Sequence, residues 1–154
     1  FVAGFQSVIE GCTASSNTDD GFDLSDGAII RNSVAHNNTM HGINASGRNL
    51  ISGVNAMGNG SANVGTTSAG IYLNGSDCRV EGNNVLGNDW GIRANVGGNF
   101  IVRNTASGNT TVIYSTVAGN VWGPVVQGST SASFSANAFS SVTGSTDPNA
   151  NYSY

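Results

Sequence analysis

The feature that most constrains this chain is a pattern that returns about every 21 residues. A glycine followed by an apolar residue opens each repeat, at Gly21, Gly42, Gly70 and Gly91. A repeat of this length is typical of a solenoid, in which each coil buries its apolar face only by stacking on its neighbours. We therefore expect a stack of coils rather than a globule with one central core.

The residues inside each repeat favour strands and tight bends over helices. Gly, Asn, Ser and Thr dominate, and apolar residues do not recur at the helical spacing. Short β-branched runs alternate with Gly and Asn, which are typical of turns. The sequence therefore predicts an all-β solenoid.

Superimposing the repeats places apolar residues in columns, as strand alternation requires. The first column contains Phe22, Ile43, Ile71, Ile92 and Val112, the second contains Ile9, Ile30, Ile51, Val80 and Ile101, and the third contains Ala14, Ala35, Ala56, Val85 and Ala106. We expect all three columns to point into the core.

An asparagine occupies one bend position of every coil. The column consists of Asn17, Asn38, Asn59, Asn88 and Asn109. Stacked side-chain amides about 4.8 Å apart can hydrogen-bond to one another, and Asn tolerates the left-handed backbone of tight bends. This column predicts an amide ladder along one edge of the solenoid.

The pattern I-x-x-N-x-V-x-x-N-x-x-G-I covers about residues 8–115 and resembles the right-handed parallel β-helix repeats of the pectate-lyase-like superfamily. The resemblance implies a right-handed parallel β-helix of about six coils. It says less about function, because that superfamily includes lyases, hydrolases, epimerases and tailspikes.

We expect one domain, with coils over residues 1–128 and a C-terminal cap over residues 129–154. About seven extra residues fall within 59–69, where a solenoid insertion forms a surface loop. The repeat stops near residue 128, but aromatic residues continue among small polar ones. Because an open solenoid end exposes unpaired backbone groups, we expect this tail to pack on the last coil.

The composition excludes some partners. The net charge is −4, and all five basic residues are arginines. This balance argues against nucleic acid and anionic membranes, and no segment is apolar enough for membrane insertion. The chain starts at Phe1 without a signal peptide, so we expect a segment of a longer, exported bacterial protein, extracellular or on the cell surface. Cys12 and Cys78 fall in different columns and are expected to be free thiols.

The densest acidic cluster lies in residues 17–24, with sequence NTDDGFDL. It resembles the calcium-binding segment of family 9 pectate lyases, and this resemblance implies Asp19, Asp20 and Asp23 as Ca²⁺ ligands. Calcium takes several carboxylate oxygens at about 2.3–2.6 Å. The alternative is a polar bend in which an aspartate accepts hydrogen bonds from backbone amides.

No catalytic residue is predicted. The family's catalytic base is a lysine, which this chain lacks. Arg93 shares a column with Asp23 but lies three coils away, about 14 Å. A general base must come within hydrogen-bond reach of the proton that it removes, so one reaction centre cannot contain both. Elements typical of polygalacturonases are also missing, apart from an NTD-G-x-D-like stretch.

The same column predicts a binding surface. Asp23, Asn44, Tyr72 and Arg93 face outward on successive coils, and Trp90 stands on the bend before Gly91. Aromatic rings beside polar groups suit sugars, whose C–H surfaces stack while their hydroxyls bond. The alternative is an ordinary scatter of surface aromatics. We expect His36 and His41 at the surface, and an ion pair between Glu10 and Arg31.

Three functions follow as hypotheses. The first is a non-catalytic segment that binds polysaccharide or has a structural role, with Ca²⁺ as the one candidate cofactor. The second is a Ca²⁺-dependent, pectate-lyase-like polysaccharide lyase with an incomplete site. The third is a tailspike-like or adhesin-like oligomer that associates through the solenoid ends or the tail.

Overall fold

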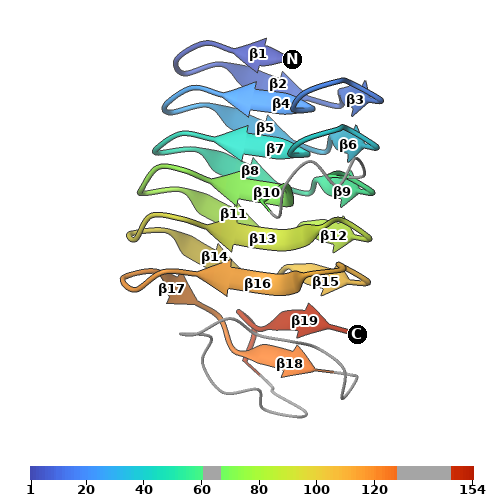
Figure 1. Ribbon diagram of the computed structural model, residues 1–154. Coiled ribbons are helices and arrows are strands. Elements are labelled where there is room, and N and C mark those ends of the chain that lie inside the picture. The colour runs from blue at the N-terminus through green and yellow to red at the C-terminus, as the bar shows by residue number, and fades with distance from the viewer. Residues whose placement is uncertain (61–66, 128–146) are drawn as a thin grey trace.

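The computed structural model describes residues 1–60, 67–127 and 147–154, and these form a parallel β-solenoid (Figure 1). Each coil contributes one strand to each of three parallel sheets, named sheets A, B and C in the order in which the chain visits them. No helix in the described part of the chain is long and apolar enough to cross a membrane.

Neighbouring strands within each sheet come from successive coils. Sheet A contains β1 (Val2–Ala3), β4 (Phe22–Leu24), β7 (Ile43–Ala45), β10 (Ala69–Leu73), β13 (Trp90–Ala94) and β16 (Val112–Thr116). Sheet B contains β2 (Val8–Glu10), β5 (Ile29–Arg31), β8 (Leu50–Ser52), β11 (Arg79–Glu81), β14 (Phe100–Val102) and β17 (Val121–Trp122). Sheet C contains β3 (Thr13–Ser15), β6 (Val34–His36), β9 (Asn55–Met57), β12 (Asn84–Leu86), β15 (Thr105–Ser107), β19 (Asn151–Ser153) and β18 (Val125–Gln127).

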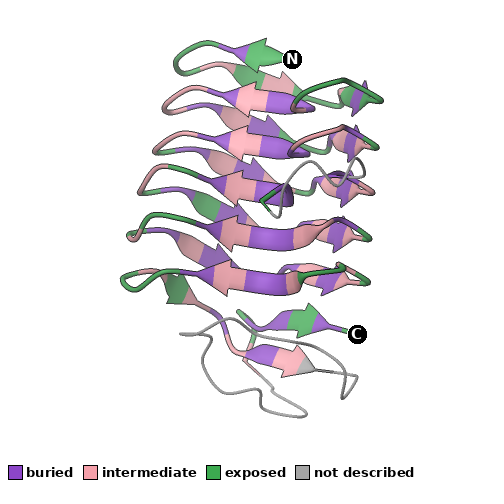
Figure 2. Cartoon of the chain, in the orientation of Figure 1, coloured by how far each residue is buried: buried purple, intermediate pink, exposed green. Residues whose placement is uncertain are grey.

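The predicted inward columns are confirmed over most of their length. Phe22, Ile43, Ile71 and Ile92 stand opposite one another in sheet A and are fully buried. The Ile30 and Ala35 columns are buried in the same way in sheets B and C. Buried residues therefore run through every coil as a continuous core, visible as the purple segments of Figure 2.

The prediction was wrong for Val112, which stands opposite Trp90, while Tyr114 takes the place next to Ile92. The reason lies in the glycine before each apolar residue. A Cβ on Gly42 would lie 2.6 Å from the carbonyl oxygen of Gly70 in the next coil. In the described chain no strand of sheet A follows β16, so no carbonyl of a further coil lies against residue 113. Ile113 can therefore stand where the earlier coils have glycine.

The asparagine ladder is confirmed at the bend between sheets C and A. The Nδ2 of Asn59 donates to the Oδ1 of Asn88 at 2.9 Å and to the carbonyl of Ala35 at 3.0 Å. Asn38 and Asn88 repeat this pattern. The left-handed residue of the bend is the one before each ladder asparagine, not the asparagine itself. These residues are Ser16, Asn37, Gly58, Gly87 and Gly108, with φ between 53° and 63°.

A second ladder, at the bend between sheets B and C, includes the C-terminal strand. Asn83 donates to Asn104 at 3.0 Å, and Asn104 donates to Asn151 at 3.1 Å. Asn151 belongs to β19, which lies between β15 and β18. The end of the tail thus joins sheet C as a strand. Residues 128–146, which make up most of the predicted cap, lie outside the described residues.

Candidate functional site

The predicted outward column is present on sheet A. Asp23 stands opposite Asn44, Asn44 opposite Tyr72, and Tyr72 opposite Arg93. All four side chains are half-buried, because strand alternation turns them away from the core while neighbouring coils flank them. The Asn44 amide accepts a hydrogen bond from Asn74 at 2.9 Å. The column forms a continuous strip across four adjacent strands.

Arg93 brings the two predicted aromatic residues together. Its guanidinium carbon lies 5.5 Å from the centre of the Tyr72 ring and 4.8 Å from the centre of the Trp90 ring. Its Nη1 donates to the carbonyl of Thr67 at 3.2 Å. Attraction between the cation and the aromatic rings holds the guanidinium at the surface, where its remaining N–H groups can meet a ligand.

His41 belongs to this site, although the sequence suggested an ordinary surface residue. It is only 7% exposed, and its ring stacks on Tyr72 at 4.4 Å with an interplanar angle of 9°. Its Nδ1 accepts the backbone N–H of Ala69 at 2.9 Å, so the neutral ring carries its proton on Nε2. Burial lowers the pKa of His41, while the charge of Asp20 opposes that shift.

The stacking limits how a sugar can meet Tyr72. The His41 ring covers one face of the tyrosine, and Arg93 also lies close to it. A ligand on sheet A therefore meets the tyrosine mainly through its edge and hydroxyl, and the arginine through its N–H groups. The sequence predicted these aromatics together, but not that the protein itself already stacks on one of them.

The arginines of the described residues fall into two groups. Four of them form ion pairs: Arg31 with Glu10 at 2.8 Å, Arg79 and Arg103 with Glu81, and Arg48 with Asp26. The predicted pair of Glu10 and Arg31 is thereby confirmed. Within the described chain, Arg93 alone has no carboxylate at ion-pair distance.

The acidic cluster lines a hollow of about 310 Å³ at the N-terminal end of sheet A. Burial raises the pKa of Asp23, and the charges of Asp20 and Asp19 raise it further. Asp20 already accepts the backbone N–H of His41 at 2.8 Å, which is the amide-capping role considered above. Among the described residues, no three His, Cys, Asp or Glu side chains are arranged to hold a metal ion. Calcium binding by Asp19, Asp20 and Asp23 stays a prediction.

Comparison with known protein families decides the classification. The family described as "Right handed beta helix region" matches residues 1–139. The chain belongs to the right-handed β-helix family. No curated protein and no solved structure matched it. The match is to the family as a whole, and such a fold supports a structural or carbohydrate-related role.

The insertion of this β-helix ends against the same site. The carbonyl of Thr67 accepts from Arg93, and the carbonyl of Ser68 accepts the backbone N–H of Trp90 at 3.0 Å. Residues 61–66, which make up the middle of the predicted insertion, lie outside the described residues. The described end of the insertion therefore helps to position both Arg93 and Trp90.

The two cysteines are free, as predicted. Cys78 is buried, and burial raises the pKa of its thiol, so the thiolate needed for nucleophilic chemistry is disfavoured. Cys12 is half-buried and packs against the core.

Proposed function

We propose that this β-helix is a non-catalytic, polysaccharide-binding segment of an exported bacterial protein, and that the outward face of sheet A holds the ligand. The ligand-binding residues are Asp23, Asn44, Tyr72, Trp90 and Arg93. A glycan that runs along the solenoid axis meets a new strand about every 4.8 Å, a spacing close to one sugar per coil.

The observation that supports this proposal most is the unpaired guanidinium of Arg93 on two aromatic rings. An arginine fork matches the geometry of carboxylate and sulfate groups, and the rings add apolar surface for the sugar backbone. We therefore expect a polysaccharide with acidic groups, bound with one of these groups at Arg93. The carboxylates of Asp19, Asp20 and Asp23 gather at the far end of the strip.

A catalytic role is not proposed. Asp23 and Arg93 are separated by three strand spacings, about 14 Å. Arg93 itself lies over two aromatic rings, and in the described chain no carboxylate lies at ion-pair distance from it. We therefore propose that this face binds a polysaccharide and does not cleave it.

Titration of the protein with polygalacturonate tests the proposal, with neutral dextran as the comparison ligand. Trp90→Ala and Tyr72→Ala should each weaken binding of polygalacturonate several-fold. Phe100→Ala is the matched control, because Phe100 lies under Arg79 on sheet B in a similar arrangement. Thermal unfolding of each variant checks that the fold is kept. If the variant that carries both Trp90→Ala and Tyr72→Ala binds polygalacturonate as well as the parent protein, the ligand does not bind on sheet A.

The lyase and the oligomer remain the alternatives. The observation that favours a cation, and with it the lyase, is the crowding of three carboxylates around one hollow. A lyase would raise the ultraviolet absorbance of a uronate polymer in the presence of Ca²⁺, because elimination makes an unsaturated product. Calcium binding would raise the unfolding temperature of the protein, and Asp23→Asn would abolish that rise. A tailspike-like or adhesin-like oligomer would instead show a multiple of the 15.6 kDa mass in solution.

A further inference from the structure

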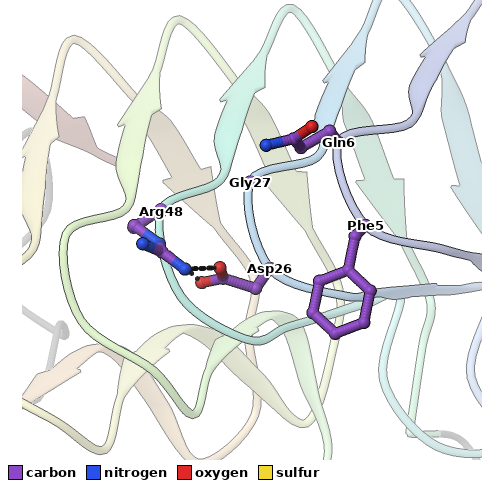
Figure 3. Close-up of a pocket in the computed structure, with 5 residues that line it drawn as sticks. All are labelled: Phe5, Gln6, Asp26, Gly27 and Arg48. Atoms are coloured by element: carbon purple, nitrogen blue, oxygen red, sulfur yellow. Dashed lines mark hydrogen bonds and ion pairs between the residues drawn. The ribbon is translucent and has the colours of Figure 1, made fainter.

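A second hollow, of about 460 Å³, lies on the bends between sheets A and B, away from the residues described above (Figure 3). Three successive coils contribute to it. Phe5 and Gln6 come from the bend between β1 and β2, Asp26 and Gly27 from the bend between β4 and β5, and Arg48 from the bend between β7 and β8.

Phe5 supplies a free aromatic surface. Phe5 is 78% exposed, and in the described chain its ring stacks on no other ring and on no arginine. Phe1 and Phe100 differ from it, because Phe1 stacks on Phe22 and Phe100 lies under Arg79. An open ring beside polar groups is the arrangement that the C–H face of a sugar needs.

Asp26 and Arg48 supply the polar side of the hollow as a fixed pair. The Nε of Arg48 donates to Oδ1 of Asp26 at 3.0 Å, and its Nη2 donates to Oδ2. This hydrogen bonding holds the pKa of Asp26 below its ordinary value, so the carboxylate is charged at neutral pH. The pair carries no net charge, yet the carboxylate keeps free lone pairs and the guanidinium keeps free N–H groups.

The backbone fixes these groups in place. Gln6, Gly27 and Arg48 each adopt a left-handed conformation, with φ of 57°, 75° and 56°. The N–H of Gln6 donates to the carbonyl of Asp26 at 3.2 Å, which ties the first bend to the second. The positive φ of Gly27 is one that side chains rarely adopt, which explains glycine at this position of the hollow.

We infer that this hollow binds a neutral pyranose sugar, with the C–H face of the ring on Phe5 and adjacent hydroxyls on Asp26 and Arg48. The side-chain amide of Gln6, which lines the hollow, supplies a further donor and acceptor. An acidic sugar would meet the Asp26 carboxylate, and a cationic amine would meet the Arg48 guanidinium. Charge therefore separates this site from the acidic-glycan face of sheet A.

The test is a titration of isotope-labelled protein with cellobiose, maltose, lactose and mannobiose, followed by NMR at the amides of Gln6 and Gly27. At least one of these neutral disaccharides should shift both signals, and digalacturonate should bind more weakly than that disaccharide. Phe5→Ala should weaken binding by about tenfold or more. Val8→Ala is the matched control, because Val8 is 60% exposed at the same end of the solenoid, and it should leave binding unchanged.

Two further variants keep the outcome decisive. Asp26→Asn keeps the size of the side chain and should also weaken binding of the neutral sugar. Arg93→Gln should leave it unaffected, so that failure here and failure of the sheet A proposal are distinguishable. The inference is overturned if none of the four disaccharides shifts the Gln6 and Gly27 signals, if Phe5→Ala binds as well as the parent protein, or if digalacturonate binds more tightly.

Discussion

The bend between sheets C and A and the outward face of sheet A use the repeat in opposite ways. The bend carries asparagine in every coil, and the amides of Asn38, Asn59 and Asn88 are buried and bonded to their neighbours. Along the sheet face the residue changes at each coil, and the side chains stay half-exposed. A position that the fold needs is thus repeated, and a position that the fold does not need is free to vary.

The outward faces of sheets A and B differ in what their arginines contact. On sheet B, Glu81 pairs with both Arg79 and Arg103, and Glu10 pairs with Arg31. On sheet A, Arg93 is held by rings instead of a carboxylate. Exposed ion pairs contribute at most about 1 kcal/mol each, so these pairs add little stability. Arg93 thus differs from the four paired arginines, because in the described chain its guanidinium has no carboxylate at ion-pair distance.

The largest effect is expected in the core that both faces share. Ile51 is fully buried between Ile30 and Val80, so Ile51→Ala should lower the free energy of unfolding by about 2–5 kcal/mol. Leu50→Ala is the control, because Leu50 is the neighbouring, outward-facing residue of the same strand. Chemical denaturation measures both variants, and equal losses would contradict the inward register.

The next effect tests the repeated bend. Asn88→Ala removes the acceptor for both amide donors of Asn59 and the donor to the carbonyl of Ala56. Unsatisfied buried groups cost about 1–3 kcal/mol, so this variant should unfold at a clearly lower temperature. Asn95→Ala, at an exposed bend position, should unfold close to the parent protein. Matching melting temperatures would mean that the ladder adds no stability.

A smaller effect is expected from the dependence of stability on pH, through His41, which lies at the bend next to the sheet A face. Burial lowers the pKa of His41 below the ordinary value of about 6.5. The unfolded chain therefore takes up a proton at a higher pH than the folded chain does, and the free energy of unfolding should fall as the pH drops below about 6.5. The raised pKa of Asp23 acts in the opposite direction at lower pH, nearer the titration range of carboxylates.

Thermal unfolding between about pH 7.5 and pH 5.5 isolates the histidine, because carboxylates titrate below this range. His41→Gln should flatten the dependence, since glutamine can accept the Ala69 N–H without titrating. An unchanged slope in this variant would contradict the assignment to His41.

Much of the fold could be predicted because each coil repeats the same constraints. Ile30, Ile51 and Val80 share one spacing and one environment, so the alternation of a single strand places them all. Strand alternation no longer gives the right register where the repetition ends. Val112 was placed in the wrong column because Ile113 stands where earlier coils need glycine. The strand β19 shows no glycine signal, although the spacing from Asn151 to Ser153 is the same as that from Asn104 to Ala106.

The candidate site could be predicted only in part. Strand alternation places Tyr72 and Arg93 side by side, which the register confirms. Strand alternation does not determine the orientation of side chains at bends, so the buried position of His41 could not be predicted. The unpaired state of Arg93 depends on where all the carboxylates lie in space, and no sequence spacing contains that information. Whether the strip binds a glycan stays a prediction.

The most direct test of the central claim compares two arginines on the two faces. Arg93→Gln and Arg79→Gln each remove a guanidinium that lies over an aromatic ring, but only Arg79 has a carboxylate partner. Calorimetric titration with polygalacturonate should show binding weakened about tenfold or more by Arg93→Gln and nearly unchanged by Arg79→Gln. Equal affinities for the two variants, or a larger loss for Arg79→Gln, would contradict the assignment of recognition to sheet A.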